Sequence, residues 1–324
     1  MVLRCIVSLE EGTTWGLPNL TAIRPHHNKE LSHEAKIASA FVMIVLLLTG
    51  VIGNGLVIFV TGYKIKTTVN SMWFLNLAIT DLIFIQFLVY LIVDVFDRRV
   101  REDILLYKCG YFTFVLTMFA SAFFLTVISV DRFLCTWCVV WAQNKRTLVK
   151  ARIICVFVWL LSICCSIPFV VFISKTHKEF QTFEHYVDSC MSLLIYMFTV
   201  GFLIPFLIIT SSYIAIGVRV RRLPRGNQIW LFRVIFVILA FFISWCPYHV
   251  LHMCIISASK NGWSDSVVEK LFRGHPFAIC LVLLNSCLNP ILYVFMCDEY
   301  KTKLKRSLLL ALEGAFTEEN LGLR

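Results

Sequence analysis

Seven long apolar runs constrain what this 324-residue chain can fold into. Several of them reach or exceed the roughly 20 residues that a helix needs to cross about 30 Å of hydrocarbon. Barrel strands would be shorter and would alternate apolar with polar residues, and these runs do neither. The sequence therefore predicts an all-α membrane protein, a bundle of seven transmembrane helices, with spans near 37–62, 70–95, 106–136, 149–173, 191–220, 229–257 and 270–296.

The composition agrees with a chain that is dissolved in a bilayer. Hydrophobic residues make up 59% of the chain and charged residues only 15%. A soluble domain of this length could not bury so much apolar surface in one core. The loops between the runs are short, so we expect one domain.

The basic residues indicate which side of the membrane each loop faces. The formal net charge is +10, and with the amino terminus outside the basic excess falls on the inner loops, as the positive-inside rule requires. Beside membrane spans, such clusters indicate contacts with anionic lipids and protein partners rather than with nucleic acid. We expect a multi-pass plasma-membrane protein with an extracellular amino terminus and an N-glycosylation sequon at Asn19. The inner clusters are Lys64/Lys66, Lys145/Arg146, Arg219/Arg221/Arg222/Arg225 and Lys301/Lys303/Lys305/Arg306.

The chain after the last span has the pattern of an amphipathic helix. Its leucines recur at spacings of three and four among basic residues, which places them on one face against the inner leaflet. Cys297 begins this segment, either as a palmitoylation site or as a plain buried thiol. We therefore divide the chain into an extracellular tail at 1–36, the bundle at 37–296, and helix 8 with a short cytoplasmic tail at 297–324.

Two of the 13 cysteines stand out by their position. Most fall inside spans, where a thiol behaves as a small apolar group. Cys109 begins the third span and Cys190 ends the loop 174–190, so both lie at the outer, oxidising side. We expect a disulfide between them, and Cys5 has no evident partner.

Polar residues at span depth are costly in a bilayer and usually functional. Asp81 lies near the middle of the second span, and Asn54, Ser121, Asn285, Ser286 and Asn289 lie at comparable depth in other helices. Such an oxygen-rich cluster binds a small cation or joins the helices by hydrogen bonds without any ion.

Asp131 and Arg132 close the third span at its cytoplasmic edge. An adjacent carboxylate holds the arginine until a competitor takes it, although a lone pair of this kind also fits a snorkelling interfacial arginine. Prolines at 205, 247 and 290 free backbone carbonyls in spans five, six and seven. They suit a bundle that opens on one side, or they are structural kinks only.

Together these residues resemble the rhodopsin-like (class A) G-protein-coupled receptors over about 270 residues. The order and spacing of the motifs carry the resemblance. The matching motifs are Gly53-Asn54, Leu77 to Asp81, Cys109 with Asp131-Arg132, Trp159, Pro205 with Tyr213, Phe241 to Pro247, and Asn289 to Tyr293. The resemblance implies an allosteric sodium site at Asp81, Ser121, Asn285 and Asn289.

Shorter stretches resemble the chemoattractant branch of that family. Segments 118–121, 140–147 and 285–290 are similar to formyl-peptide, chemerin and prostaglandin D chemoattractant receptors, and 245–250, 272–277 and 303–308 are most similar to the prostaglandin D type. That likeness favours an anionic lipid such as a prostaglandin D as ligand, with a peptide chemoattractant as the alternative. Met197 and Ile173 stand where prostaglandin D receptors carry a lysine and an arginine, so the ligand does not follow from the resemblance.

The same likeness places a ligand pocket near the outer end of the bundle. Its expected wall is aromatic, thioether and imidazole in character, which suits an apolar ligand with one polar or anionic head. The wall residues are Tyr111, Phe114, Met118, Met197, Tyr248, His249, His252, His275 and Ile279. Lys175, Lys178, His252 and His275 are the cations that would replace the absent lysine, although the histidines also fit ordinary wall residues or, less well, a zinc site.

By resemblance, ligand pressure near Trp245 would rotate the inner half of helix six about Pro247. Arg132 would then leave Asp131 while Tyr213 and Tyr293 reorganise around it, and a G-protein helix of the inhibitory Gi/o class, then arrestin, would enter.

Two other classes of function remain open. A non-signalling scavenger or decoy receptor is favoured if Val139, which replaces the usual proline, and the short tail impair coupling. A transporter or channel would carry charged pairs along a path or inverted repeats, and we find neither. We find no nucleophile–base set, so we do not expect an enzyme.

Overall fold

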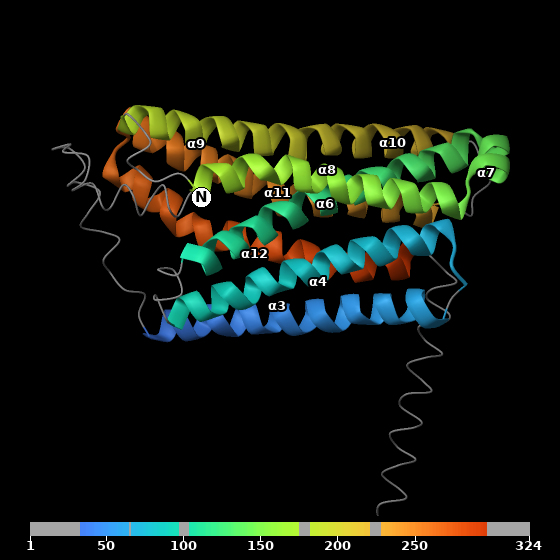
Figure 1. Cartoon of the computed structure of the whole chain (residues 1–324), viewed down its shortest axis with the longest axis horizontal. Helices are drawn as coiled ribbons and strands as arrows, with labels where there is room; N and C mark the ends of the chain where they lie inside the picture. Colours follow the sequence, from blue (N-terminus) through green and yellow to red (C-terminus); the bar gives the residue numbers. More distant parts are fainter. Residues whose placement is uncertain (1–32, 65, 97–103, 175–181, 221–227, 297–324) are drawn as a thin grey trace, which may run out of the picture.

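The computed structural model describes residues 33–64, 66–96, 104–174, 182–220 and 228–296. These residues are almost entirely helical, and the helices lie side by side along the long axis of the molecule (Figure 1). The elements are α3 (His33–Phe59) with η3 (Val60–Lys64), α4 (Val69–Phe96), α6 (Ile104–Trp137), α7 (Val139–Lys145), α8 (Leu148–Ser174), α9 (Phe183–Phe198) with η5 (Thr199–Leu203) and α10 (Ile204–Val220), α11 (Gln228–Asn261) and α12 (Asp265–Met296).

Seven helices in the described residues are long and apolar enough to span a bilayer, which confirms the predicted seven-helix fold. One of the seven is the continuous helix α9–η5–α10, drawn in yellow (Figure 1). We call the end of the bundle with Lys64, Asp131 and Arg219 the inner end, and the end with Cys190 and Asn261 the outer end. The predicted helix 8, Asn19, Lys175 and Lys178 lie outside the described residues.

Helix α6 forms the centre of the bundle. It packs against α4, α8 and α10. In its most apolar stretch of 18 residues, 67% of the residues are buried, against 17% in the corresponding stretch of α3. Helix α8 instead exposes a row of apolar side chains that includes Val149, Ile153 and Phe157. Since this row would be unfavourable in water, it is the surface that faces lipid.

The fifth span begins at Phe183, eight residues before the predicted start at 191. Thr182 caps the helix, because its side chain accepts a hydrogen bond from the backbone N–H of His185, and Glu184 adds a negative charge to the first turn. The expected loop through residue 190 is therefore partly helical, and Cys190 lies inside α9.

The same span contains a local π-turn at η5, directly before Pro205. Proline has no N–H to donate, so a regular helix would lose a hydrogen bond here. The N–H of Ile204 donates to the carbonyl of Thr199, five residues back, which moves the irregularity into one turn. Prolines also occur inside α8, α11 and α12, so prolines inside helices are not restricted to spans five, six and seven.

Two inter-helix contacts fix the packing around α4 and α12. The indole of Trp159 on α8 donates a hydrogen bond to the Asn76 side chain on α4 at 3.1 Å. Gly53 on α3 lies so close to Pro290 on α12 that an added Cβ would sit 2.9 Å from the proline Cγ. Because the proline ring is rigid, glycine is the residue that permits this approach.

We expect Gly53→Ala to separate α3 from α12 and to lower stability by about 1–3 kcal/mol, the usual cost of overpacking. The measurement is the thermal unfolding midpoint of the purified protein in detergent or nanodiscs. Gly55→Ala is the matched control, since an added Cβ at Gly55 meets no atom within 4 Å. An equal midpoint for the two variants would contradict the close packing at Pro290.

Candidate functional site

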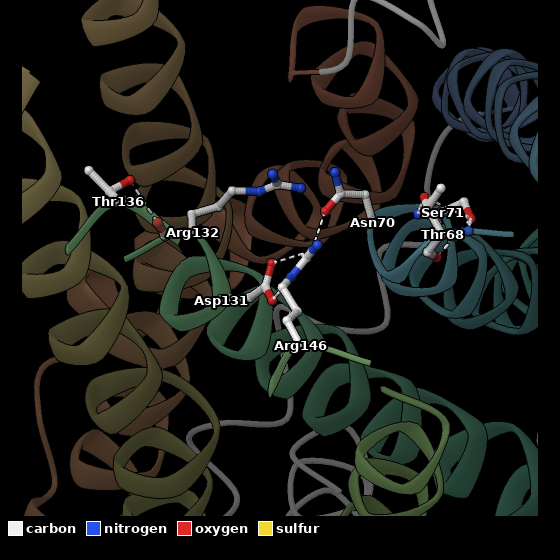
Figure 2. Close-up of polar contacts among 7 residues, drawn as sticks. All are labelled: Thr68, Asn70, Ser71, Asp131, Arg132, Thr136 and Arg146. Atoms are coloured by element: carbon white, nitrogen blue, oxygen red, sulfur yellow. Dashed lines mark hydrogen bonds and ion pairs between the residues drawn. The ribbon is translucent and has the colours of Figure 1, made fainter. Parts of the chain in front are cut away.

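The inner end of α6 carries a partly buried ion pair between Asp131 and Arg146. Arg146, which follows α7, donates from Nε to one oxygen of Asp131 at 2.7 Å and from Nη2 to the other at 2.8 Å. Its Nη2 also donates to the side-chain oxygen of Asn70 on α4 (Figure 2). Burial lowers the pKa of Arg146, but the hydrogen bonds and charge of Asp131 raise it above its ordinary value overall. One cation thus joins α6, α4 and the connection after α7.

The predicted pairing of Asp131 with its neighbour Arg132 is therefore wrong in this structure. Successive residues of a helix point about 100° apart, so adjacent side chains do not face each other. The carboxylate faces Arg146, while the side chain of Arg132 extends away from it (Figure 2).

Arg132 is partly buried, and it has no ionic partner among the described residues. Its buried Nε has no hydrogen-bond acceptor among the described residues. Tyr213 of α10, the second predicted switch residue, is almost fully buried and lies within range of the Arg132 charge. Tyr293 lies in α12, and its side chain is outside the described part of the chain.

Sequence reasoning missed Arg146 and Asn70 as members of this site. Arg146 was counted only as part of a basic cluster and of the chemoattractant-like segment 140–147. The signal for its role was its position. It is the basic residue between a seven-residue helix and α8, which allows it to turn back to the end of α6.

The structure brings Asp81 and Asn289 together in the middle of the bundle. Asn289 of α12 donates to the Asp81 carboxylate of α4 at 2.8 Å, and the buried Ser286 of α12 lies near the same carboxylate. Ser121 of α6 is buried, and its hydroxyl has no partner among the described residues. Asn285 is also buried, but no hydrogen bond in the described chain joins it to Asp81.

Toward the outer end, several predicted pocket residues form a series of ring contacts across α6, α11 and α12. The ring centroids are 6.2 Å apart for Tyr111–Phe114, 5.6 Å for Phe114–Tyr248, 4.1 Å for Tyr248–His252 and 5.1 Å for His252–His275. The Nδ1 of His252 is 2.7 Å from the Tyr248 carbonyl and acts as the donor, which leaves its Nε2 directed elsewhere.

Apart from Ile279, which lies on α12, the remaining pocket candidates lie on or beside the helix α9–η5–α10. His249 packs against Phe198 and Phe202, and its Nε2 is buried without a partner among the described residues. Met118 approaches Gly201 so closely that an added Cβ would sit 2.7 Å from the Met118 Cε, and Met197 is fully buried. Ile279 is partly buried against the core of the bundle.

Trp245 joins the ring series to the proline bend of α11. Its ring lies 6.5 Å from Phe114 and 6.2 Å from His249, two residues before Pro247. The zinc alternative finds no support, because no group of three or more possible metal ligands occurs in the described residues.

The predicted disulfide between Cys109 and Cys190 is absent. Cys109 is a free, exposed thiol, whereas Cys190 is fully buried and disulfide-bonded. All other described cysteines are free, so the partner of Cys190 lies outside the described residues. The reason is helical phase. Cys109 precedes the buried Met118 by nine residues, about two and a half turns, which places it on the opposite face of α6.

We expect Arg146→Gln to lower stability by about 1–3 kcal/mol, because it leaves a partly buried Asp131 without its cation. Asp131→Asn with Arg146→Gln should cost less than the sum of the two single changes, as measured by thermal unfolding. Lys150→Gln, an exposed site on α8, is the control. Additive losses would show that the pair contributes no coupling.

Comparison with known proteins agrees with this architecture. The family model of the 7 transmembrane receptor (rhodopsin family) matches residues 53–293. The chain is 40% identical over 301 residues to the C3a anaphylatoxin chemotactic receptor of Danio rerio, which covers 90% of this chain and 81% of that receptor. It is 33% identical over 313 residues to chemerin-like receptor 1 of Homo sapiens, with 88% and 82% covered. For chemerin-like receptor 2 of Macaca mulatta the identity is 33% over 288 residues, with 83% and 78% covered.

The family model spans residues 53–293, which include the residues of the candidate site described above. The matches confirm the predicted chemoattractant branch, and they identify the protein as a receptor rather than an enzyme. The chain therefore belongs to the rhodopsin family of seven-transmembrane, G-protein-coupled receptors.

Proposed function

We propose that this chain is a plasma-membrane receptor, with its amino terminus outside, that binds a peptide chemoattractant and activates an inhibitory Gi/o-type G protein. The observation that carries this proposal is the similarity to receptors named for C3a and chemerin over more than four fifths of the chain. These names favour a peptide over the prostaglandin D that the shorter motifs favoured.

The buried residues at the outer end support a ligand with an apolar contact surface. Phe114, Met118, Met197 and Tyr248 are buried side chains that offer aromatic and thioether groups. His275 is only partly buried and is in ring contact with His252, so it is the polar group best placed to meet a ligand from outside. Lys175 and Lys178 would add positive charge if an anionic group binds there.

The inner end supports G-protein coupling by a different route from the predicted one, in which Arg132 leaves Asp131. Since Arg132 has no ionic partner among the described residues, it would not first have to leave an ion pair before it met a G-protein helix near Tyr213. The Asp131–Arg146 pair would stay closed and hold the end of α6. Arrestin would follow at the same surface.

The test is a ligand screen on cells that express the chain, read as inhibition of cAMP formation with and without Gi blockade. We expect C3a-type or chemerin-type peptides to act, and the response to disappear under blockade. A response to prostaglandin D alone would overturn the peptide proposal. Ligand uptake without any signal would indicate a decoy receptor.

We also propose that the Asp81 cluster holds an allosteric sodium ion. The group supplies the oxygen ligands that a small hard cation prefers, from Asp81, Ser121 and Asn289, with Asn285 nearby in α12. The partnerless hydroxyl of Ser121 fits this reading, because a bound cation would satisfy it.

We expect the unfolding midpoint of the purified receptor to rise when sodium replaces potassium at constant ionic strength, and Asp81→Asn to abolish the difference. Ser121→Ala should weaken it. Ser129→Ala is the control, since that buried hydroxyl already donates to the carbonyl of Thr126. Equal midpoints in sodium and potassium for the parent receptor would reject the cation site.

A further inference from the structure

The inner ends of α6 and α10 are joined through one aromatic ring. The indole of Trp137, the last residue of α6, donates from Nε1 to the backbone carbonyl of Ala215 on α10 at 3.1 Å. The guanidinium of Arg219, one turn further along α10, lies 5.1 Å from the centroid of the same ring. Phe133 supports the ring from within α6 at 6.2 Å.

This arrangement differs from that expected of an ordinary interfacial tryptophan. Trp137 is 40% exposed, and a tryptophan at a membrane edge usually directs its N–H toward water and headgroups. Here the N–H meets a carbonyl of a neighbouring helix, and an exposed arginine of that helix covers the ring. Two contacts from α10 thus converge on one side chain of α6.

The position of these contacts gives them a consequence for coupling. Ala215 lies two residues after Tyr213 on α10, and Trp137 lies five residues after Arg132 on α6. The contacts of Trp137 with α10 therefore lie about one turn closer to the inner end than Arg132 and Tyr213 do. A helix is stiff over one turn. The separation of α6 and α10 at Trp137 therefore sets the separation at Tyr213.

We propose that Trp137 is a positioning residue, and that its contacts with Ala215 and Arg219 form a clamp that holds α10 in the resting position. Opening the clamp lets the inner end of α10 move from α6 and makes Arg132 accessible to the G protein. The clamp rests on the G-protein coupling proposed above. Its effect is a population shift, since it stabilises only the resting arrangement.

The test compares Trp137→Phe with Trp141→Phe in the full-length receptor in nanodiscs. Trp141 is a second exposed tryptophan nearby, on α7, and its side chain makes no hydrogen bond among the described residues. Trp137→Phe keeps an aromatic ring but loses the N–H. We expect it to raise ligand-independent nucleotide exchange on Gi by about two- to tenfold, the factor for one lost hydrogen bond. Trp141→Phe should match the parent receptor.

The arginine provides a second, independent variant. Arg219→Ala should raise the same rate by about two- to fivefold, as for a lost exposed cation–π contact, whereas Arg219→Lys should restore most of the parent behaviour. With Trp137→Phe and Arg219→Ala combined, the increase should be smaller than the product of the two single increases. Arg219→Ala by itself also keeps the proposal testable if Trp137→Phe fails to fold.

Amide hydrogen exchange at residues 216–220 supplies a readout that needs neither ligand nor G protein. It should be faster in Trp137→Phe than in Trp141→Phe. If the parent receptor activates no G protein, the proposed coupling fails while this measurement still decides whether the clamp exists. Equal exchange in the two variants overturns the clamp. Faster amide exchange with unchanged nucleotide exchange, in a parent that couples, overturns its positioning role.

Discussion

The bilayer leaves backbone N–H and C=O groups without water, and the rest of the structure depends on this constraint. Every spanning segment must satisfy its backbone internally, so irregular turns appear only where the chain forces them. The π-turn before Pro205 is such a place. Polar side chains follow the same rule. Most of the buried hydroxyls donate to a carbonyl of their own helix, as Thr61, Thr80, Thr117, Ser129, Ser162 and Ser166 do.

Against that background, the few polar side chains that bond across helices carry the most information. Asn54 donates to the Ser286 carbonyl between α3 and α12, Asn289 to Asp81 between α12 and α4, and Trp159 to Asn76 between α8 and α4. At the inner end, Arg146 joins Asp131 to Asn70, and Trp137 reaches Ala215. Helix α4 takes part in three of these five links. These directed polar contacts run from the middle of the bundle to its inner end, whereas aromatic rings around Phe114 and Tyr248 pack together toward the outer end.

The sequence was sufficient where period and depth decide the outcome. Seven apolar runs predicted seven spanning helices, and the shared depth of Asp81 and Asn289 predicted that these residues meet. The sequence was insufficient where the helical phase of a residue or the reach of its side chain decides which residues meet. Cys109 was placed at the correct height but on the wrong face of α6. Asp131 was paired with its sequence neighbour, although a residue fifteen positions later has the geometry to form both hydrogen bonds. The early start of α9 depended on one capping side chain, Thr182, within an otherwise polar segment.

The inner end of α6 is held on two sides, and neither set of contacts supplies a partner to Arg132 within the described residues. Arg146 satisfies Asp131 and links α6 toward α4, while Trp137 links α6 toward α10. Neither contact uses Arg132, whose Nε is buried without an acceptor among the described residues. A buried donor without a partner costs roughly 1–3 kcal/mol. In the G-protein coupling proposed above, a partner helix that presents a carbonyl or carboxylate to Arg132 would recover that free energy, and the negative end of its dipole would add to the attraction. The arginine would then favour the bound state at the expense of the resting one, because only binding would supply it with an acceptor.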